Sequence, residues 1–354
     1  MRTQLSNSPT DSARDYLRGK RVMVTGACGT VGTELVHQLF ERFEIGTLTA
    51  IDHNETELVF LEEHYAPRGN VRFLLADVRD GATLMREMRQ VDVLFHAAAY
   101  KHVYMCERSP LEAVQTNILG VQNVLQAALD SAVERLVFTS SDKAVNPTNV
   151  MGTSKLMGER LVTAAATHPN NSAAVFLSTR FGNVLGSRGS VIPIFCDQIK
   201  RGGPVTLSDP RMTRFIMSLD EAVRLVIESA VIGRPGDVLI TKMPAIRITD
   251  LAKVMIREYA PRCGYRPDAI ELRVVGPKPG EKLYEELMNE EETRRSFEIE
   301  QYFVIRPAVM ASPAEGRDNS LGEGVGRPYN SRNVPPLSEE ELAEFLRRSR
   351  LIGD

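Results

Sequence analysis

The 354-residue sequence lacks the features that would direct it to a membrane, a metal or nucleic acid. No run approaches the roughly 18 apolar residues of a membrane-spanning helix, and the polar N-terminus carries no apolar signal segment. The four cysteines, at positions 28, 106, 196 and 263, form no Cys-x-x-Cys pair and no zinc pattern, and scattered thiols fit a reducing compartment. The formal net charge of −3 gives no general attraction to DNA, RNA or anionic lipid. We therefore expect a cytoplasmic protein that binds no metal, no nucleic acid and no membrane.

The sequence does contain, from Lys20 onwards, short β-branched runs that alternate with longer helical patterns. In the helical patterns apolar residues recur at 3.6-residue spacing, as at Ile118, Val121, Leu125 and Leu129. The alternation predicts βαβ units and an α/β fold with a Rossmann-like, doubly wound parallel sheet. The predicted strands are residues 22–24, 48–51, 71–75, 93–96, 136–139 and 175–178, and the predicted helices include residues 33–42, 117–131, 153–167, 219–231, 249–258 and 338–348.

A glycine-rich turn follows the first predicted strand. The segment Thr25-Gly26-Ala27-Cys28-Gly29-Thr30-Val31-Gly32 has the Gly-x-x-Gly-x-x-Gly spacing of a dinucleotide-binding turn. Such glycines allow a tight turn and close approach of a pyrophosphate, while the next helix presents free N–H groups to it. The alternative is an ordinary left-handed turn, but the position between a strand and a helix favours a cofactor site. We assign to it Gly26, Gly29, Thr30, Val31 and Gly32.

Acidic and small residues end the next predicted strands. Asp52 stands twenty residues after Gly32, where a carboxylate suits the adenosine ribose hydroxyls and repels a 2′-phosphate. We therefore expect NAD rather than NADP, although Asp52 could instead cap the following helix. Asp77 is expected near the adenine, and His96 is expected to be a packed strand residue. The remaining cofactor assignments are Asn54, Val78, Ala97, Ala98 and Ala99, the last three because small residues leave room for a flat ligand.

Three regions follow from these patterns. Residues 1–18 are polar and are predicted to be an N-terminal extension that frays. Residues 19–182 are predicted to form the NAD-binding Rossmann domain. Residues 183–354, richer in Gly and Pro at first, are predicted to form mainly a smaller, less regular substrate lobe, with some segments returning to the sheet.

Candidate catalytic residues follow the fifth predicted strand. Ser141, Asp142 and Lys143 bring a hydroxyl, a carboxylate and an amine together at a strand end, where ligands of such sheets bind. Further along, Met151 and Lys155 are four residues apart and share one helix face.

These motifs resemble the extended short-chain dehydrogenase/reductase family, which carries the glycine-rich turn and a Tyr-x-x-x-Lys pair. In that family the Tyr acts on a sugar hydroxyl, and the Lys lowers the Tyr pKa and holds the nicotinamide ribose. Lys155 matches the Lys, whereas Met151 stands in place of the Tyr, and a thioether has no proton to exchange.

Residues 141–152 resemble one subfamily, the nucleotide-sugar 4,6-dehydratases of polysaccharide (CapD-like) and nonulosonic acid biosynthesis, some of which have Met at this place. They act chiefly on UDP-N-acetylglucosamine. The resemblance extends over residues 20 to about 310 and includes residues 100–103, 180–190, 209–215 and 279–282.

The implied dehydration moves a hydride from sugar C4 to NAD, eliminates water across C5 and C6, and returns the hydride to C6. It needs an acid and a base besides the cofactor. We expect Lys143 to be the C5 base, with a pKa lowered by desolvation and by Lys155. Asp142 would take the C4 proton through Ser141 and later help the C6 hydroxyl leave. The alternative is that Asp142 and Lys143 are only an ion pair at a helix terminus.

Arginines after the sheet suit a nucleotide diphosphate, because guanidinium groups bind phosphate in a bidentate way. Arg214 is favoured as a ligand, whereas Arg211 is as well explained as a solvated charge. Lys101 and Asn183 resemble family positions near the sugar and its diphosphate, and Glu281 is assigned to a ribose or the sugar. The substrate assignments are Lys101, Asn183, Arg188, Val191, Arg214 and Glu281, with a UDP-sugar favoured.

Two other functions fit the same scaffold. A nucleotide-sugar 4-epimerase or reductase would need no acid–base pair at C5 and C6, and epimerases usually keep the Tyr that Met151 replaces. A non-catalytic NAD-binding protein is supported only by Met151. The resemblance also implies a homo-oligomer, a dimer or larger, assembled through helices of the nucleotide-binding lobe.

Overall fold

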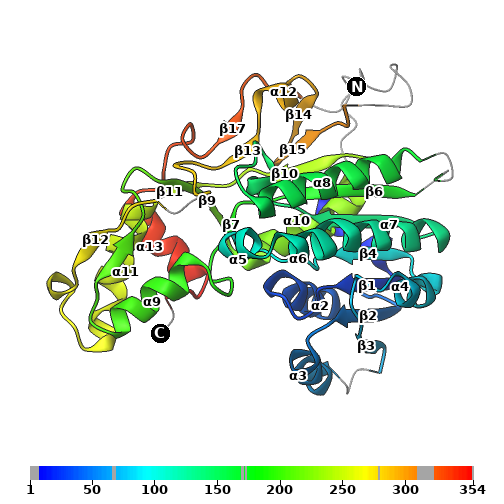
Figure 1. Ribbon diagram of the computed structural model, residues 1–354, viewed down its shortest axis with the longest axis horizontal. Coiled ribbons are helices and arrows are strands. Elements are labelled where there is room, and N and C mark those ends of the chain that lie inside the picture. The colour runs from blue at the N-terminus through cyan, green and yellow to red at the C-terminus, as the bar shows by residue number, and fades with distance from the viewer. Residues whose placement is uncertain are drawn as a thin grey trace.

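The computed structural model describes residues 8–65, 69–168, 171, 174–277, 280–308 and 323–352. Its largest element is a ten-stranded sheet with helices against both faces (Figure 1). The strands of this sheet are β1 (Arg21–Thr25), β2 (Thr47–Asp52), β3 (Val71–Leu75), β4 (Val93–His96), β5 (Arg135–Thr139), β6 (Val175–Arg180), β10 (Val238–Thr241), β14 (Ser296–Ile299), β15 (Tyr302–Ile305) and β16 (Glu323–Gly324).

The strand order is β16-β14-β15-β10-β6-β5-β4-β1-β2-β3. From β10 to β3 neighbouring strands run parallel, while β15 and β14 add antiparallel. The predicted doubly wound α/β class is thus confirmed. The order reverses between β1 and β4, which places a ligand crevice beyond the carboxyl ends of these strands.

Helices cover both faces, so the central strands read as continuous apolar runs: β4 is buried along its whole length. One face of the sheet packs on the helices α1 (Pro9–Leu17), α2 (Thr30–Arg42) and α10 (Leu219–Ile232). The other face packs on the helices α4 (Gly81–Glu87), α7 (Gly120–Asp130) and α8 (Val150–Ala166). The helix α3 (Glu55–Tyr65) lies beside β3 at the sheet edge.

The prediction that the N-terminal extension frays is wrong for residues 9–17. They form α1, which packs against α10 and buries Ala13 and Leu17 completely. These two apolar residues are four apart and so share one helix face, which gives an otherwise polar segment a side to bury. Ser8 caps the helix by accepting a hydrogen bond from the Asp11 N–H at 3.2 Å. Residues 1–7 of the extension lie outside the described residues.

A second group of elements lies beside the sheet, at the left of Figure 1. Its helices pack around an apolar core of their own, which includes Phe195, Leu251 and Leu346. Its elements are α9 (Val191–Lys200), α11 (Ile248–Tyr259), α13 (Glu339–Arg348), β8 (Val205–Leu207) and β12 (Leu272–Val274).

Short strands join this lobe to the large sheet. The joining strands are β7 (Asn183–Val184), β9 (Thr213–Met217) and β11 (Ala245–Arg247), which form one small sheet, and β13 (Glu286–Met288) and β17 (Tyr329–Asn330), which form another. The division of the chain at residue 182 remains a proposal, since β10, β14, β15 and β16 lie beyond it and extend the large sheet.

Among the described residues, no helix combines the length and the apolar character that crossing a bilayer requires.

Candidate functional site

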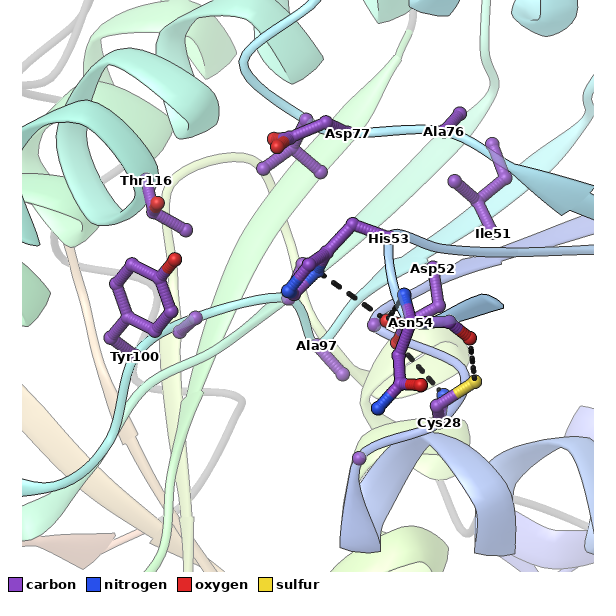
Figure 2. A pocket seen from close by; sticks show the side chains of 15 residues that line it. Cys28, Ile51, Asp52, His53, Asn54, Ala76, Asp77, Ala97, Tyr100 and Thr116 are labelled. Carbon is purple, nitrogen blue, oxygen red and sulfur yellow. Dashed lines mark hydrogen bonds and ion pairs between the residues drawn. The ribbon is translucent and has the colours of Figure 1, made fainter. Parts of the chain in front are cut away.

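Two neighbouring pockets open at the carboxyl edge of the sheet. The smaller pocket, of about 220 Å³, lies beyond the ends of β1, β2, β3 and β4. Figure 2 shows Cys28, Asp52 and Asn54 on one side of it and Tyr100 and Thr116 on the other. The predicted cofactor residues that line it are Gly26, Gly29, Asp52, Asn54, Asp77, Val78, Ala97, Ala98 and Ala99.

The glycine-rich turn is shaped by backbone contacts that exclude side chains. Gly26 has φ +74°, and a Cβ there would lie 2.5 Å from the Ala98 nitrogen. A Cβ on Gly32 would lie 2.0 Å from the Gly26 oxygen. Both positions therefore require glycine, one for its dihedral angle and both for space. The turn leads directly into α2, whose first residues include Thr30 and Val31; neither of these nor Gly32 lines the smaller pocket.

Asp52 ends β2 inside the smaller pocket and is 8% exposed. Its carboxylate accepts hydrogen bonds from the Cys28 N–H at 2.9 Å and the Asn54 N–H at 3.0 Å. The helix α3 is capped instead by Asn54, whose side-chain oxygen accepts from the Glu57 N–H at 3.2 Å. The alternative that Asp52 caps this helix is therefore wrong, and Asp52 is held by two backbone donors at the pocket wall.

A carboxylate also marks the end of β3. Asp77 accepts hydrogen bonds from Arg79, and this contact holds the pKa of Asp77 below its ordinary value despite partial burial. His96, at the end of β4, is buried and pairs its Nδ1 with the Thr25 hydroxyl at 2.6 Å. Burial lowers the pKa of His96 to about 3, so the ring is neutral and packed, and it lines neither pocket.

The larger pocket, of about 360 Å³, lies between the sheet and the second lobe. The segment after β4 borders both pockets, because Ala97 to Tyr100 line the smaller one and Val103, the first residue of α5 (Val103–Arg108), lines the larger one. The predicted site residues that line the larger pocket are Lys143, Asn183, Val191, Arg214 and Glu281.

Ser141, Asp142 and Lys143 form a hydrogen-bonded cluster after β5. Ser141 caps a single 3₁₀ turn by accepting from the Lys143 N–H at 3.2 Å, and its hydroxyl donates to Asp142 Oδ1 at 2.6 Å. Lys143 Nζ donates to the same oxygen at 3.0 Å. The Asp142 side chain is 1% exposed, whereas that of Lys143 is 27% exposed and reaches the larger pocket. The ammonium group is therefore the member of the cluster that a ligand can touch.

The expectation of a lowered pKa for Lys143 is wrong for the protein without ligands. Burial lowers this pKa, but the carboxylates of Asp142 and Glu285 together outweigh burial and leave it raised. Glu285 Oε1 lies 3.7 Å from Lys143 Nζ. The cation that opposes the rise is Arg214 rather than Lys155.

Met151 and Lys155 lie on α8 and are buried. Met151 packs with Cys106 and Ala113 in a small apolar cluster. Lys155 Nζ donates to the Thr139 carbonyl at 2.8 Å, and burial lowers its pKa to about 8. Neither residue lines the smaller or the larger pocket.

Arg188 lies by the glycine-rich turn, and neither Arg188 nor Lys101 lines the larger pocket. The Arg188 N–H donates to the Thr30 hydroxyl at 3.3 Å, and its side chain, 65% exposed, pairs with Glu57 at 2.8 Å. Partial burial and the charge of Arg188 lower the pKa of Lys101. Arg211 is exposed and pairs with Asp209.

Arg214 lines the larger pocket, but protein acceptors already bind its guanidinium. It donates to the Thr213 carbonyl at 2.7 Å and the Lys282 carbonyl at 2.9 Å, and its Nε lies 3.5 Å from Glu285 Oε1. A phosphate would compete with these acceptors. Of the motif at residues 279–282, Pro279 lies outside the described residues.

Two residues of this site were not predicted. Glu285 is described above, and Asn117 lies in a π-helical turn, Gln115–Leu119, before α7. The Asn117 amide pairs with both the N–H and the carbonyl of Tyr100, at 2.8 and 2.9 Å, and donates to Ser154 on α8 at 2.9 Å. It thus fixes the segment after β4 against α8. The sequence signal was an Asn within an apolar helical pattern, which is ambiguous because such residues also cap helices.

Several known proteins are similar to this chain in sequence. Residues 22–307 match the family described as polysaccharide biosynthesis protein. The chain is 44% identical over 333 residues to a Methanocaldococcus jannaschii protein named as an uncharacterized membrane protein, with 94% of this chain and 97% of that one covered. It is 36% identical over 338 residues to a UDP-glucose 4-epimerase of Rickettsia canadensis, with 92% and 95% covered. It is 39% identical over 283 residues to the Staphylococcus aureus capsular polysaccharide biosynthesis protein CapD, with 78% of this chain and 46% of that protein covered.

Solved structures agree in fold. Pen from Bacillus thuringiensis has a TM-score of 0.85 and 38% identity, with 94% of this chain and 98% of that one covered. The dTDP-glucose 4,6-dehydratase DesIV of Streptomyces venezuelae, solved with NAD, has a TM-score of 0.65 and 23% identity, with 74% and 86% covered, and supports the fold alone. By its sequence and its fold, the chain belongs to the polysaccharide biosynthesis protein family.

Proposed function

We propose that this protein is an NAD-dependent nucleotide-sugar 4,6-dehydratase that acts on UDP-N-acetylglucosamine. The observation that carries the proposal is the Asp142–Lys143 pair, of which Lys143 lines the larger pocket, together with the burial of Met151 at the place of the family's phenol. An elimination across C5 and C6 needs such an acid–base pair, and a 4-epimerase does not.

The smaller pocket suits the adenosine end of a dinucleotide. A side chain at Gly26 would clash with the Ala98 backbone, so the turn beside the pocket must keep its glycine, and the Asp52 carboxylate lines the pocket as an acceptor for ribose hydroxyls. We assign NAD rather than NADP, because the same carboxylate repels a 2′-phosphate. When bound, NAD supplies the hydride acceptor for C4 and the hydride donor for C6.

The chain's own residues move the protons. Ser141 donates to Asp142, so a proton from the C4 hydroxyl can pass through Ser141 to a carboxylate that solvent hardly reaches. Lys143 faces the pocket and is assigned to the C5 proton. Lys155 is assigned to the nicotinamide ribose, as in the family.

The residues assigned to the substrate lie in two places. Asn183, Val191, Arg214 and Glu281 line the larger pocket and are assigned to the sugar and its nucleotide. Arg188, whose N–H contacts Thr30, and Lys101 are assigned to the diphosphate. The cytoplasmic location and the homo-oligomer remain predictions.

A 4-epimerase is the second candidate, and the similarity to the Rickettsia canadensis protein of that name favours it. The two functions separate by product mass. We expect the purified protein, incubated with NAD and UDP-N-acetylglucosamine, to form a product lighter by one water. A product of unchanged mass would support an epimerase, and no product with any UDP-sugar would indicate a non-catalytic NAD-binding protein.

A further inference from the structure

Glu285 is a buried carboxylate that has no role in the proton transfers proposed for Ser141, Asp142 and Lys143. It is 4% exposed and lines the larger pocket. Its Oε1 lies 3.7 Å from Lys143 Nζ and 3.5 Å from Arg214 Nε. Its Oε2 has no hydrogen-bond partner among the described residues. A buried oxygen without a partner is unusual and calls for a reason.

The backbone around Glu285 is held firmly. The Ser331 hydroxyl accepts from the Glu285 N–H at 3.0 Å, and the Ser331 N–H donates to the Glu285 carbonyl at 2.9 Å. The guanidinium of Arg214 is fixed by backbone carbonyls, as described above. Glu285 therefore faces the pocket from a fixed position.

The charges that face Glu285 come from three segments. They are the ammonium of Lys143 and the carboxylate of Asp142 from the turn after β5, Arg214 from β9, and Lys282 from Glu285's own segment. Burial raises the pKa of Glu285 and opposes the lowering by Lys143. Lys143 itself rests as an ammonium group, so it must lose a proton before it can accept the one from C5.

Of the two carboxylates beside Lys143, only Glu285 lines the larger pocket. Asp142 Oδ1 already accepts from Ser141 and from Lys143, and although Asp142 Oδ2, like Glu285 Oε2, has no partner among the described residues, the Asp142 side chain is 1% exposed. Asp142 is thus connected to the pocket through its neighbours, whereas Glu285 meets it directly.

We propose that Glu285 is a catalytic residue that takes the ammonium proton of Lys143 and delivers it to the C6 hydroxyl as that group leaves, a step that the sequence had assigned to Asp142. This inference rests on the proposed dehydratase function.

The step balances without a further reactant. An N–H bond of the Lys143 ammonium breaks and an O–H bond forms on Glu285. The free amine then takes the C5 proton, and the C5–H electrons form the C5–C6 double bond as the C6–O bond breaks. The departing hydroxide takes the Glu285 proton and leaves as water. Lys143 ends as an ammonium group and Glu285 as a carboxylate, as both began.

The test is the pH dependence of turnover in Glu285→Gln. In the wild type the proton moves within the Lys143–Glu285 pair, so the rate is independent of pH between the two titrations. In Glu285→Gln, Lys143 must lose its proton to solvent, so we expect the rate to fall about 100-fold near neutrality and to rise about tenfold per pH unit towards the pKa of Lys143. The matched control is Glu286→Gln, because Glu286 pairs with Lys282 and Asn146 and does not line the larger pocket.

A Glu285→Gln profile parallel to that of the wild type, or an equal loss in Glu286→Gln, would mean a structural role and overturn the inference. A second measurement needs no turnover: the nitrogen-15 shift of the Lys143 amine should titrate about one pH unit lower in Glu285→Gln. An unchanged titration would show that the two groups do not share a proton. A wild type that converts no nucleotide-sugar would sink the dehydratase proposal itself, and the amine titration would still report whether the pair is coupled.

Discussion

The two pockets differ in the residues that line them. The lining of the smaller pocket includes two glycines, four alanines and the carboxylates of Asp52 and Asp77, and it comes from one stretch of the chain, residues 26–116. The larger pocket is lined by charged side chains from segments that are far apart in the chain, such as Lys143, Arg214 and Glu285.

The two pockets should therefore respond differently to substitution. Where the wall of a pocket is backbone, as at Gly26 and Ala98, an added side chain should distort the wall and weaken ligand binding. A pocket made of opposed charges fails when one charge is removed, because its partners are then left buried and unpaired. The predictions below test this contrast.

The largest effect is expected for Lys143→Met. The substitution removes the only amine of the Ser141–Lys143 cluster, and we expect turnover to fall by about 10³-fold while NAD affinity stays unchanged, because Lys143 does not line the smaller pocket. Product formation and NAD titration measure the two effects. Near-wild-type turnover would remove Lys143 from the mechanism.

The next effect concerns a buried cluster of charged side chains that joins β6, α8 and α12 (Glu290–Thr293). Arg180 on β6 is buried and pairs with Glu159 on α8 at 2.6 Å and with Glu292 on α12 at 2.8 Å. Arg180→Met leaves two buried carboxylates unpaired, so we expect a loss of about 3–5 kcal/mol in the free energy of unfolding. Urea denaturation measures it. A loss below about 1 kcal/mol would mean that water reaches these carboxylates.

Gly26→Ala tests the smaller pocket. The new Cβ would meet Ala98, so we expect NAD affinity to fall about 100-fold, with a smaller loss of stability. Gly19→Ala is the matched control, because Gly19 has φ +70° but nothing within 4 Å of its Cβ position. Equal effects in both variants would assign the loss to the dihedral angle rather than to the contact with Ala98.

The smallest effect is expected for Asp52→Asn. The substitution removes the charge but keeps an oxygen that can accept from Cys28, so we expect the preference for NAD over NADP to shrink about tenfold through better NADP binding. Competitive titration with the two dinucleotides measures the ratio. An unchanged ratio would place the 2′-position away from Asp52.

Much of the strand pattern was predictable because the sheet is buried on both faces. The run at residues 93–96 was predicted at the bounds that β4 has, since this central parallel strand reads as a continuous apolar segment. The run at residues 71–75 was also predicted at the bounds of β3, although β3 is an edge strand whose residues are at most partly buried. The N-terminal helix was missed, because its short apolar face becomes visible only when α10 is there to cover it.

The glycine turn, the acid at Asp52 and the polar cluster at Ser141–Lys143 could be predicted from the sequence, because each depends on residues close together in the chain. The contact of Glu285 with Lys143, the carbonyls that hold Arg214 and the position of Arg188 by the glycine turn follow from the fold and could not be predicted. The reason is separation along the chain. The conformation of a turn depends on the dihedral angles and spacing of its own residues, whereas a charged pocket depends on which distant segments the fold brings together. The pKa of Lys143 therefore could not be derived from its neighbours in sequence, since the carboxylate of Glu285, which helps to raise it, lies far along the chain.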